Sequence, residues 1–234
     1  MEIRCVWEHN GDDSLIYAEN FPGAFSRGAN RDIALSKIAA EVRSYIAWVG
    51  ADCPADLKPV VTLEQASELA ILDADSDVLF PSERRPLTRS EYLSLKALVM
   101  KSAADFQKLY DSIPDKDYST RSARKTFYGP VPRTAREMYE HTKNVNDYYF
   151  GEIGVQADHE GTIVDCRCRG FAALEREEGF LWCSVFEGSY GELWTLRKVL
   201  RRFLWHDRIH AKAMYRAALN SSAASVENVF HFSK

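Results

Sequence analysis

The chain has 234 residues, of which 46% are hydrophobic and 27% are charged, and its formal net charge is -4 at pH 7. This balance is typical of a globular protein with one or two domains. The acidic net charge argues against a protein whose main task is to hold nucleic acid or an anionic membrane surface.

Targeting signals and cysteine patterns exclude further classes. The first residues, MEIRCVWEHNGDDSLIYAEN, carry charges where a signal peptide needs an apolar stretch, and no window approaches the ~18 apolar residues of a membrane span. The five cysteines include no CxxC pair, so neither a disulfide framework nor a zinc ribbon is indicated. We therefore expect a cytoplasmic protein that has neither a membrane nor a nucleic acid as its partner.

Residues 1–72 are predicted to form an α+β domain. Alternating apolar side chains predict strands, and the polar run around Gly11 predicts a hairpin turn between the first two. From Arg31 the apolar spacing becomes helical, and Gly50 stands where a helix C-cap is expected. The expected order is strand 2–8, strand 14–18, strand 24–27, helix 31–49 and strand 58–63.

Residues 73–87 are predicted to be a linker, because they are charged, contain two prolines and show no periodicity. The following sequence has helical spacing throughout. Helices are expected over 89–112, 134–150, 161–177 and 190–219. The region 88–219 is therefore predicted to be an all-α four-helix bundle. The tail, 220–234, is either disordered or docked through Val229, Phe230 and Phe232.

Three helix starts are marked by a Ser or Thr that is followed by Glu three residues later. This pattern is a capping box, in which each of the two side chains accepts a hydrogen bond from a free backbone N–H. The pairs are Thr88 with Glu91, Thr134 with Glu137 and Ser189 with Glu192.

Three histidines fall on the inward faces of two predicted helices. On the last helix, one stripe at helical spacing contains Leu196, Val199, Phe203, His206, His210 and Met214. On the 134–150 helix, the apolar stripe contains Met138, His141, Val145 and Tyr148. Two such stripes in one bundle can face each other, which would bring His141 next to His206 and His210.

This histidine pattern predicts a divalent metal ion. A buried imidazole needs a partner for its inward nitrogen, and histidine is a common ligand for zinc that also suits nickel and iron. Three protein ligands leave coordination positions open, as in catalytic sites. The alternative is that each histidine is a core residue that bonds only to backbone or carboxylate oxygens.

Other polar residues near the histidines have two interpretations each. Asp207 either orients His210 or a neighbour, or, as is more common, is a surface carboxylate paired with Arg208 or Arg202. Tyr148 is a candidate proton donor, although an inward tyrosine is more often a core aromatic residue. The basic run is expected to be a solvated face; it consists of Arg197, Lys198, Arg201, Arg202 and Arg208.

The region from about 86 to 219 resembles the DinB-like superfamily. The resemblance lies in REMYEHTKNVNDYYFGEI (136–153) and ELWTLRKVLRRFLWHDRIHAKAMYRAAL (192–219). It implies a four-helix bundle, often dimeric, in which the second helix supplies one metal ligand and the last helix supplies two. These positions match His141, His206 and His210 here. Characterised relatives include transferases that use low-molecular-weight thiols such as mycothiol or bacillithiol, and a maleylpyruvate isomerase.

The N-terminal segment is similar to HicB-type antitoxins. The similarity covers SLIYAENFPGAFSRGANRDIALSKIAAEVRSYIAWVG (14–50) and implies strands, a Pro-Gly turn and a helix. Proteins of that family pair with a small toxin. In this chain a sensing, dimerising or substrate-gating role fits the segment equally well.

Two functions follow from these observations. The first is a metal-dependent enzyme with transferase or isomerase chemistry at the three histidines, with a low-molecular-weight thiol as a possible co-substrate. The second is a non-catalytic binding or regulatory protein whose N-terminal domain recruits a protein partner. The count of three ligands rather than four favours the enzyme.

Overall fold

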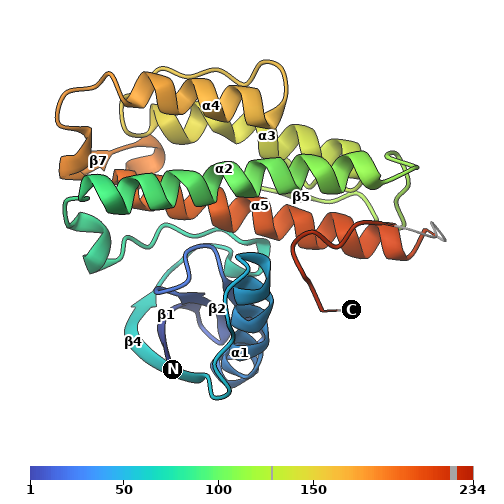
Figure 1. Ribbon diagram of the computed structural model, residues 1–234. Coiled ribbons are helices and arrows are strands. Elements are labelled where there is room, and N and C mark those ends of the chain that lie inside the picture. Colours follow the sequence, from blue (N-terminus) through green and yellow to red (C-terminus); the bar gives the residue numbers. More distant parts are fainter. Residues whose placement is uncertain (128, 222–225, 234) are drawn as a thin grey trace. The chain divides into compact units, whose positions relative to one another are not determined.

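The computed structural model describes residues 1–127, 129–221 and 226–233. The chain divides into two compact units, residues 1–80 with 230–234 and residues 81–229. The first unit contains a mixed sheet and the second is largely helical, as the sequence predicts (Figure 1).

The sheet of the first unit has the strand order β3-β2-β1-β4. Its strands are β1 (Glu2–Asn10), β2 (Asp13–Ala18), β3 (Phe25–Gly28) and β4 (Lys58–Ala66). β1 pairs antiparallel with β2 and parallel with β4. Gly11 has a φ of 58°, which allows the tight turn between β1 and β2.

Helix α1 (Arg31–Trp48) packs against β2, β3 and β4. The side chain of Asn30 caps its first turn by accepting a hydrogen bond from the Ile33 N–H. Beyond its end, Gly50 takes the left-handed conformation with a φ of 72°. The apolar face of α1, which includes Ile38 and Val42, is buried and forms the core of this unit with the sheet.

The predicted linker, 73–87, is divided between the two units. Its first part follows the 3-10 helix η1 (Ile71–Asp73) and bonds to the sheet, because the Ser76 hydroxyl donates to Glu8 and accepts from Tyr17. Its second part contains the 3-10 helix η2 (Pro81–Arg84) and bonds to the helical unit, where Arg197 donates to the carbonyls of residues 85 and 86.

The second unit is built on the helices α2, α3, α4 and α5. Helix α2 packs against α3, α4 and α5, and α3 also packs against α4 and α5. The helices are α2 (Arg89–Ser112), α3 (Ala135–Gly151), α4 (Ile163–Leu174) and α5 (Leu196–Leu219). The connecting segments hold the 3-10 helices η3 (Phe180–Trp182) and η4 (Ser189–Gly191) and two short hairpins, β5 (Lys125–Thr126) with β6 (Gly129–Pro130) and β7 (Phe186–Glu187) with β8 (Leu193–Trp194).

The capping boxes at Thr88 and Thr134 are confirmed, since each threonine accepts from the N–H of the glutamate whose carboxylate accepts from the threonine N–H. A third box starts α4, where Thr162 and Asp165 make the same exchange. Aspartate at the third position can therefore replace the glutamate of the usual pattern.

The predicted capping box of Ser189 with Glu192 is wrong. The helix begins six residues later than expected, at Leu196, and its cap is Thr195, whose hydroxyl accepts from the Lys198 N–H. Residues 186–194 form a hairpin instead, in which Phe186 of β7 pairs with Trp194 of β8. Tyr190 has a φ of 61°, so a helix cannot pass through this position.

The C-terminal tail docks on the first unit. Phe230 stacks on Trp48 of α1 with ring centroids 5.4 Å apart, and Phe232 stacks on Phe230. The Ser44 hydroxyl donates to the carbonyl of Phe230. Of the two alternatives for the tail, the structure shows docking for its last residues, while residues 222–225 and 234 lie outside the described part.

Candidate metal centre

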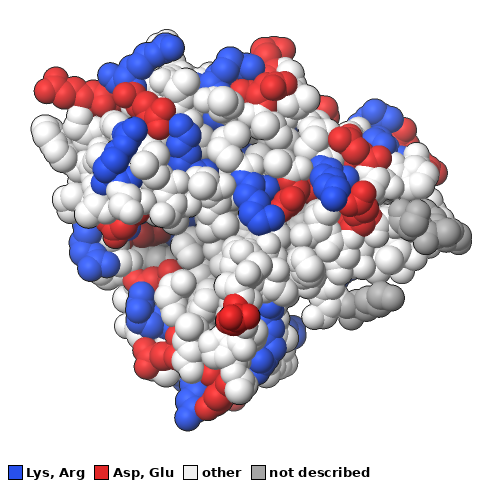
Figure 2. All heavy atoms as spheres, viewed as in Figure 1, with Lys and Arg blue, Asp and Glu red and all other residues white. Residues whose placement is uncertain are grey.

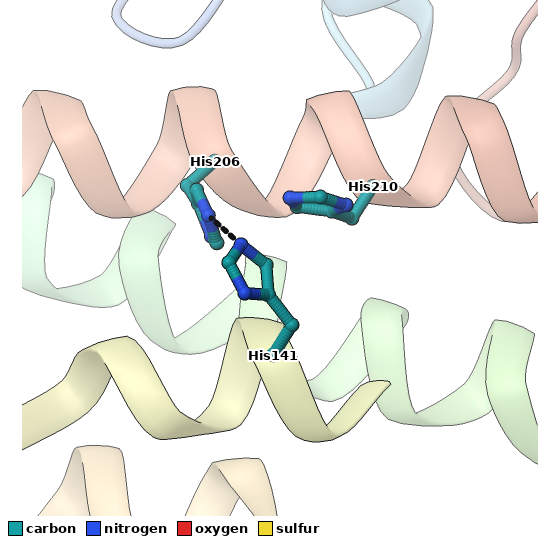
Figure 3. A group of neighbouring side chains, drawn as sticks. All are labelled: His141, His206 and His210. Carbon is teal, nitrogen blue, oxygen red and sulfur yellow. Dashed lines mark hydrogen bonds between the residues drawn. The ribbon is translucent and has the colours of Figure 1, made fainter. Parts of the chain in front are cut away.

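The three histidines predicted to bind a metal come together between α3 and α5. Tyr149 of α3 contacts Phe203, and His141 contacts His210, so the two helices run antiparallel. Because 206 and 210 are one helical turn apart, both rings of α5 project to the side on which α3 presents His141 (Figure 3).

The ring nitrogens are close enough to share one ion. The ring centroids lie 5.0 Å apart for His141 and His206, 4.7 Å for His141 and His210, and 4.5 Å for His206 and His210. Nε2 of His206 lies 3.2 Å from Nε2 of His141 (Figure 3). One candidate ligand atom from each ring can be chosen so that all lie within 4.8 Å of one another.

The separation of Nε2 in His141 and His206 fits two ligands of one divalent ion. Zinc–nitrogen bonds of about 2.0–2.1 Å in a tetrahedral site put two ligand nitrogens roughly 3.3 Å apart. The distance of 3.2 Å between Nε2 of His141 and Nε2 of His206 is close to this separation. The same separation also suits one N–H···N hydrogen bond between the two rings, whereas the alternative considered from the sequence was bonding to backbone or carboxylate oxygens.

The surroundings of His141 and His206 favour the neutral form of these two rings. Burial lowers the pKa of His141. Burial lowers the pKa of His206 much further, and the neighbouring histidines and the guanidinium groups of Arg202 and Arg167 add to this effect. A neutral imidazole has the free lone pair that a metal needs, so no proton has to be removed at neutral pH.

Burial differs among the three rings. His206 is buried, with 8% of its surface exposed, whereas His141 and His210 are half-buried. Nδ1 of His206 is buried and has no hydrogen-bond partner among the described residues. The ring therefore offers Nε2 to the site without a fixed hydrogen bond behind it.

Asp207 is not the surface carboxylate that was expected. It is fully buried and pairs with Arg167 of α4, with O–N distances of 3.3 and 3.4 Å. Its side chain lies about 100° around the helix from His206, which turns it away from the site and toward α4. Arg167 was not singled out in the sequence, because nothing in its local pattern distinguishes it from a surface arginine.

Two adjacent tyrosines of α3, Tyr148 and Tyr149, differ in their contacts with the histidines. Tyr148 is half-buried and contacts the rings of Tyr149 and Trp194. Burial raises its pKa well above the usual value, so the phenol stays protonated at neutral pH. The tyrosine that meets the histidines is its neighbour Tyr149, whose ring stands edge-on to His206 with centroids 6.0 Å apart.

The prediction of a solvated basic face on α5 is also wrong. Lys198 pairs with Glu192, Arg201 pairs with Glu83, and Arg202 lies over aromatic rings. Four of the five residues are buried: Lys198, Arg201, Arg202 and Arg208. On the face drawn in Figure 2, acidic and basic side chains are interspersed, which is not the continuous basic stripe of a nucleic-acid site.

Comparisons of the chain with protein-family models, curated proteins and solved structures found no match. Within the described residues, no helix combines the length and the apolar character that crossing a membrane requires.

Proposed function

We propose that the chain holds a divalent metal ion with His141, His206 and His210 and acts as a metal-dependent enzyme. The observation that supports this proposal is the convergence of three imidazoles from α3 and α5, of which those of His141 and His206 have lowered pKa values. The donor set has three members rather than four, and His141 and His210 are half-buried, which suits a site that also admits a small molecule.

The same proposal includes a DinB-like four-helix bundle made by α2 to α5. In its support, the second helix of the unit supplies one histidine and the last supplies two, four residues apart. Zinc, nickel and iron all suit imidazole ligands. When bound, such an ion supplies Lewis-acid chemistry and makes a thiol or a water beside it more acidic.

We assign the chain's own residues the following roles in transferase or isomerase chemistry with a low-molecular-weight thiol. The three histidines bind the ion, and the Tyr149 ring packs at nearly a right angle to that of His206. Tyr148 is a weak candidate for the proton donor: its raised pKa makes it a donor rather than a base, but its described ring contacts are with Tyr149 and Trp194.

Metal content tests the site directly. Protein purified without a histidine tag is expected to contain metal close to one equivalent per chain, and the variant His206→Ala is expected to lose it. His159→Ala is the matched control, because His159 is partly exposed and pairs with Asp147. Equal metal content in the wild-type protein and His206→Ala would show that the site assignment is wrong.

Cobalt spectroscopy tests the chemistry. Thiols that act as co-substrates are expected to change the visible spectrum of the Co(II)-loaded protein. If no thiol or substrate analogue changes the spectrum, the thiol-dependent enzyme is refuted and the binding protein becomes the better hypothesis. A stoichiometric partner bound by residues 1–80 would then be the next observation to seek.

A further inference from the structure

Arg167 of α4 contacts helix α5 on both sides of His206. Its guanidinium carbon lies 3.8 Å from the centroid of the Phe203 ring, and its terminal nitrogens bond to the carboxylate of Asp207. Phe203 and Asp207 are one turn apart and bracket His206 in the sequence. Arg167 and Asp207 are both fully buried, so this contact is part of the core of the unit.

His206 lacks the hydrogen bond that usually orients a metal-binding imidazole. Such a ring commonly donates its second N–H to a carboxylate, a carbonyl or a water molecule, which fixes the direction of the ring. Here Nδ1 of His206 is buried, and no group in the described part of the chain forms a hydrogen bond with it. The direction of Nε2 therefore depends on ring packing, which includes Tyr149, and on the rotation of α5 about its axis.

Small rotations of α5 are large on the scale of a metal bond. A rotation of about 10° moves a ring nitrogen some 7 Å from the helix axis by roughly 1 Å. A binding constellation tolerates only about 0.5 Å of misplacement. The site thus needs interactions that fix the rotation of α5. Arg167 contacts α5 at Phe203 and Asp207, next to His206.

Stability alone does not account for the buried pair of Arg167 and Asp207. Removing two charges from water is costly, and apolar residues of similar volume are often equally or more stabilising at such positions. Within residues 1–127, 129–221 and 226–233, the Nε of Arg167 also lacks a hydrogen-bond partner, so the hydrogen bonds of the pair are incomplete. A buried ion pair can instead fix the register of two elements, since only one arrangement keeps both charges paired.

We propose that Arg167 and Asp207 are positioning residues of the metal site, which hold α5 in the rotation that directs Nε2 of His206 toward His141. This inference rests on the proposed function, because it assigns the pair a role only if the histidines bind an ion. Arg167 and Asp207 do not contact the ion in this scheme; they act through Phe203 and the backbone of α5.

The test compares two variants that each remove one buried ion pair from α5. Arg167→Met/Asp207→Leu removes the pair with α4, and Arg201→Met/Glu83→Leu removes the pair with η2. For each variant and the wild-type protein, we would measure Co(II) affinity, the Co(II) ligand-field spectrum and the free energy of unfolding in urea. Wild-type Co(II) binding that is lost in His206→Ala establishes the site used for the comparison.

The Arg167→Met/Asp207→Leu variant is expected to bind Co(II) at least about tenfold more weakly, with a changed ligand-field spectrum. The Arg201→Met/Glu83→Leu control is expected to keep the wild-type affinity and spectrum. If the first variant does not fold, Asp207→Asn, which keeps the side-chain shape, is measured in its place with the same expectation.

Two results would overturn the inference, and they are distinguishable. Unchanged affinity and spectrum in the Arg167 and Asp207 variant, with normal binding by the wild-type protein, would refute the positioning role and leave the metal site intact. Failure of the wild-type protein to bind Co(II) would refute the proposed metal site and the positioning role with it.

Discussion

Single charged side chains in the helical unit are buried together with a specific partner. Lys198 lies against Glu192, the carbonyl of Leu193 and the ring of Trp194. The guanidinium of Arg202 lies 4.6 Å from the ring centroid of Trp205. Long aliphatic stems make such residues compatible with a core, provided that the charged end has a partner.

Lys198 makes stability depend on pH. Burial lowers its pKa from 10.5 to about 8, so between pH 8 and 10.5 the unfolded chain binds more protons than the folded chain and stability rises with pH. Relative to Lys198→Met, the unfolding free energy of the wild-type protein is expected to rise by up to about 3 kcal/mol across this window. Urea unfolding at a series of pH values measures this difference in unfolding free energy. Titration of tyrosines and cysteines affects both proteins alike and cancels in the comparison. Parallel pH curves for the two proteins would contradict this expectation.

At the scale of the elements, α3 and α4 approach closely where α4 has a glycine. A Cβ at Gly170 would lie 2.2 Å from a ring carbon of Phe150, which is buried against Phe171 and Phe203. Phe150 is fully buried, and these two neighbours are core residues as well. Gly170 therefore sets the distance between the helix that carries His141 and the helix that carries Arg167.

Gly170→Ala is expected to destabilise the protein by up to about 2 kcal/mol, since overpacking costs about 1–3 kcal/mol and the gain in helix propensity returns about 1 kcal/mol. Gly151→Ala is the matched control, because a Cβ at Gly151 meets nothing within 4 Å. That control is expected to be neutral or slightly stabilising. Urea unfolding distinguishes the two, and equal stabilities would show that α3 and α4 can separate at no cost.

At the scale of the whole molecule, the two units differ in whether one continuous stretch of sequence forms them. Residues 81–229 form a continuous unit, whereas the first unit combines residues 1–80 with 230–234. Phe230 is fully buried and stacks on Trp48, so the core of the first unit is completed only when residue 230 has been synthesised.

Phe230→Ala is expected to destabilise the first unit by about 3 kcal/mol, because it removes a buried aromatic ring that packs against α1. Hydrogen exchange of the α1 amides should accelerate accordingly. Ser233→Ala, at an exposed position of the same tail, is expected to leave the exchange unchanged. Wild-type exchange rates in the Phe230→Ala variant would indicate that the tail contributes no stability to α1.

The sequence by itself determined the features that depend on local spacing. Thr88 and Thr134 define helix starts because their capping partners are three residues away, and the stripes containing His141, His206 and His210 follow from the helical period. These interactions are made within one or two turns of a helix, so no knowledge of the rest of the chain is needed to predict them.

Only the tertiary structure decided the features that depend on residues distant in sequence. Ser189 and Glu192 have the pattern of a cap, yet the pairing of Phe186 with Trp194 takes this segment into a hairpin. Asp207 has the sequence neighbours of a surface residue, but Arg167, 40 residues away, is buried against it. Long-range packing can override a local preference because burying a side chain with a partner involves more free energy than one capping hydrogen bond.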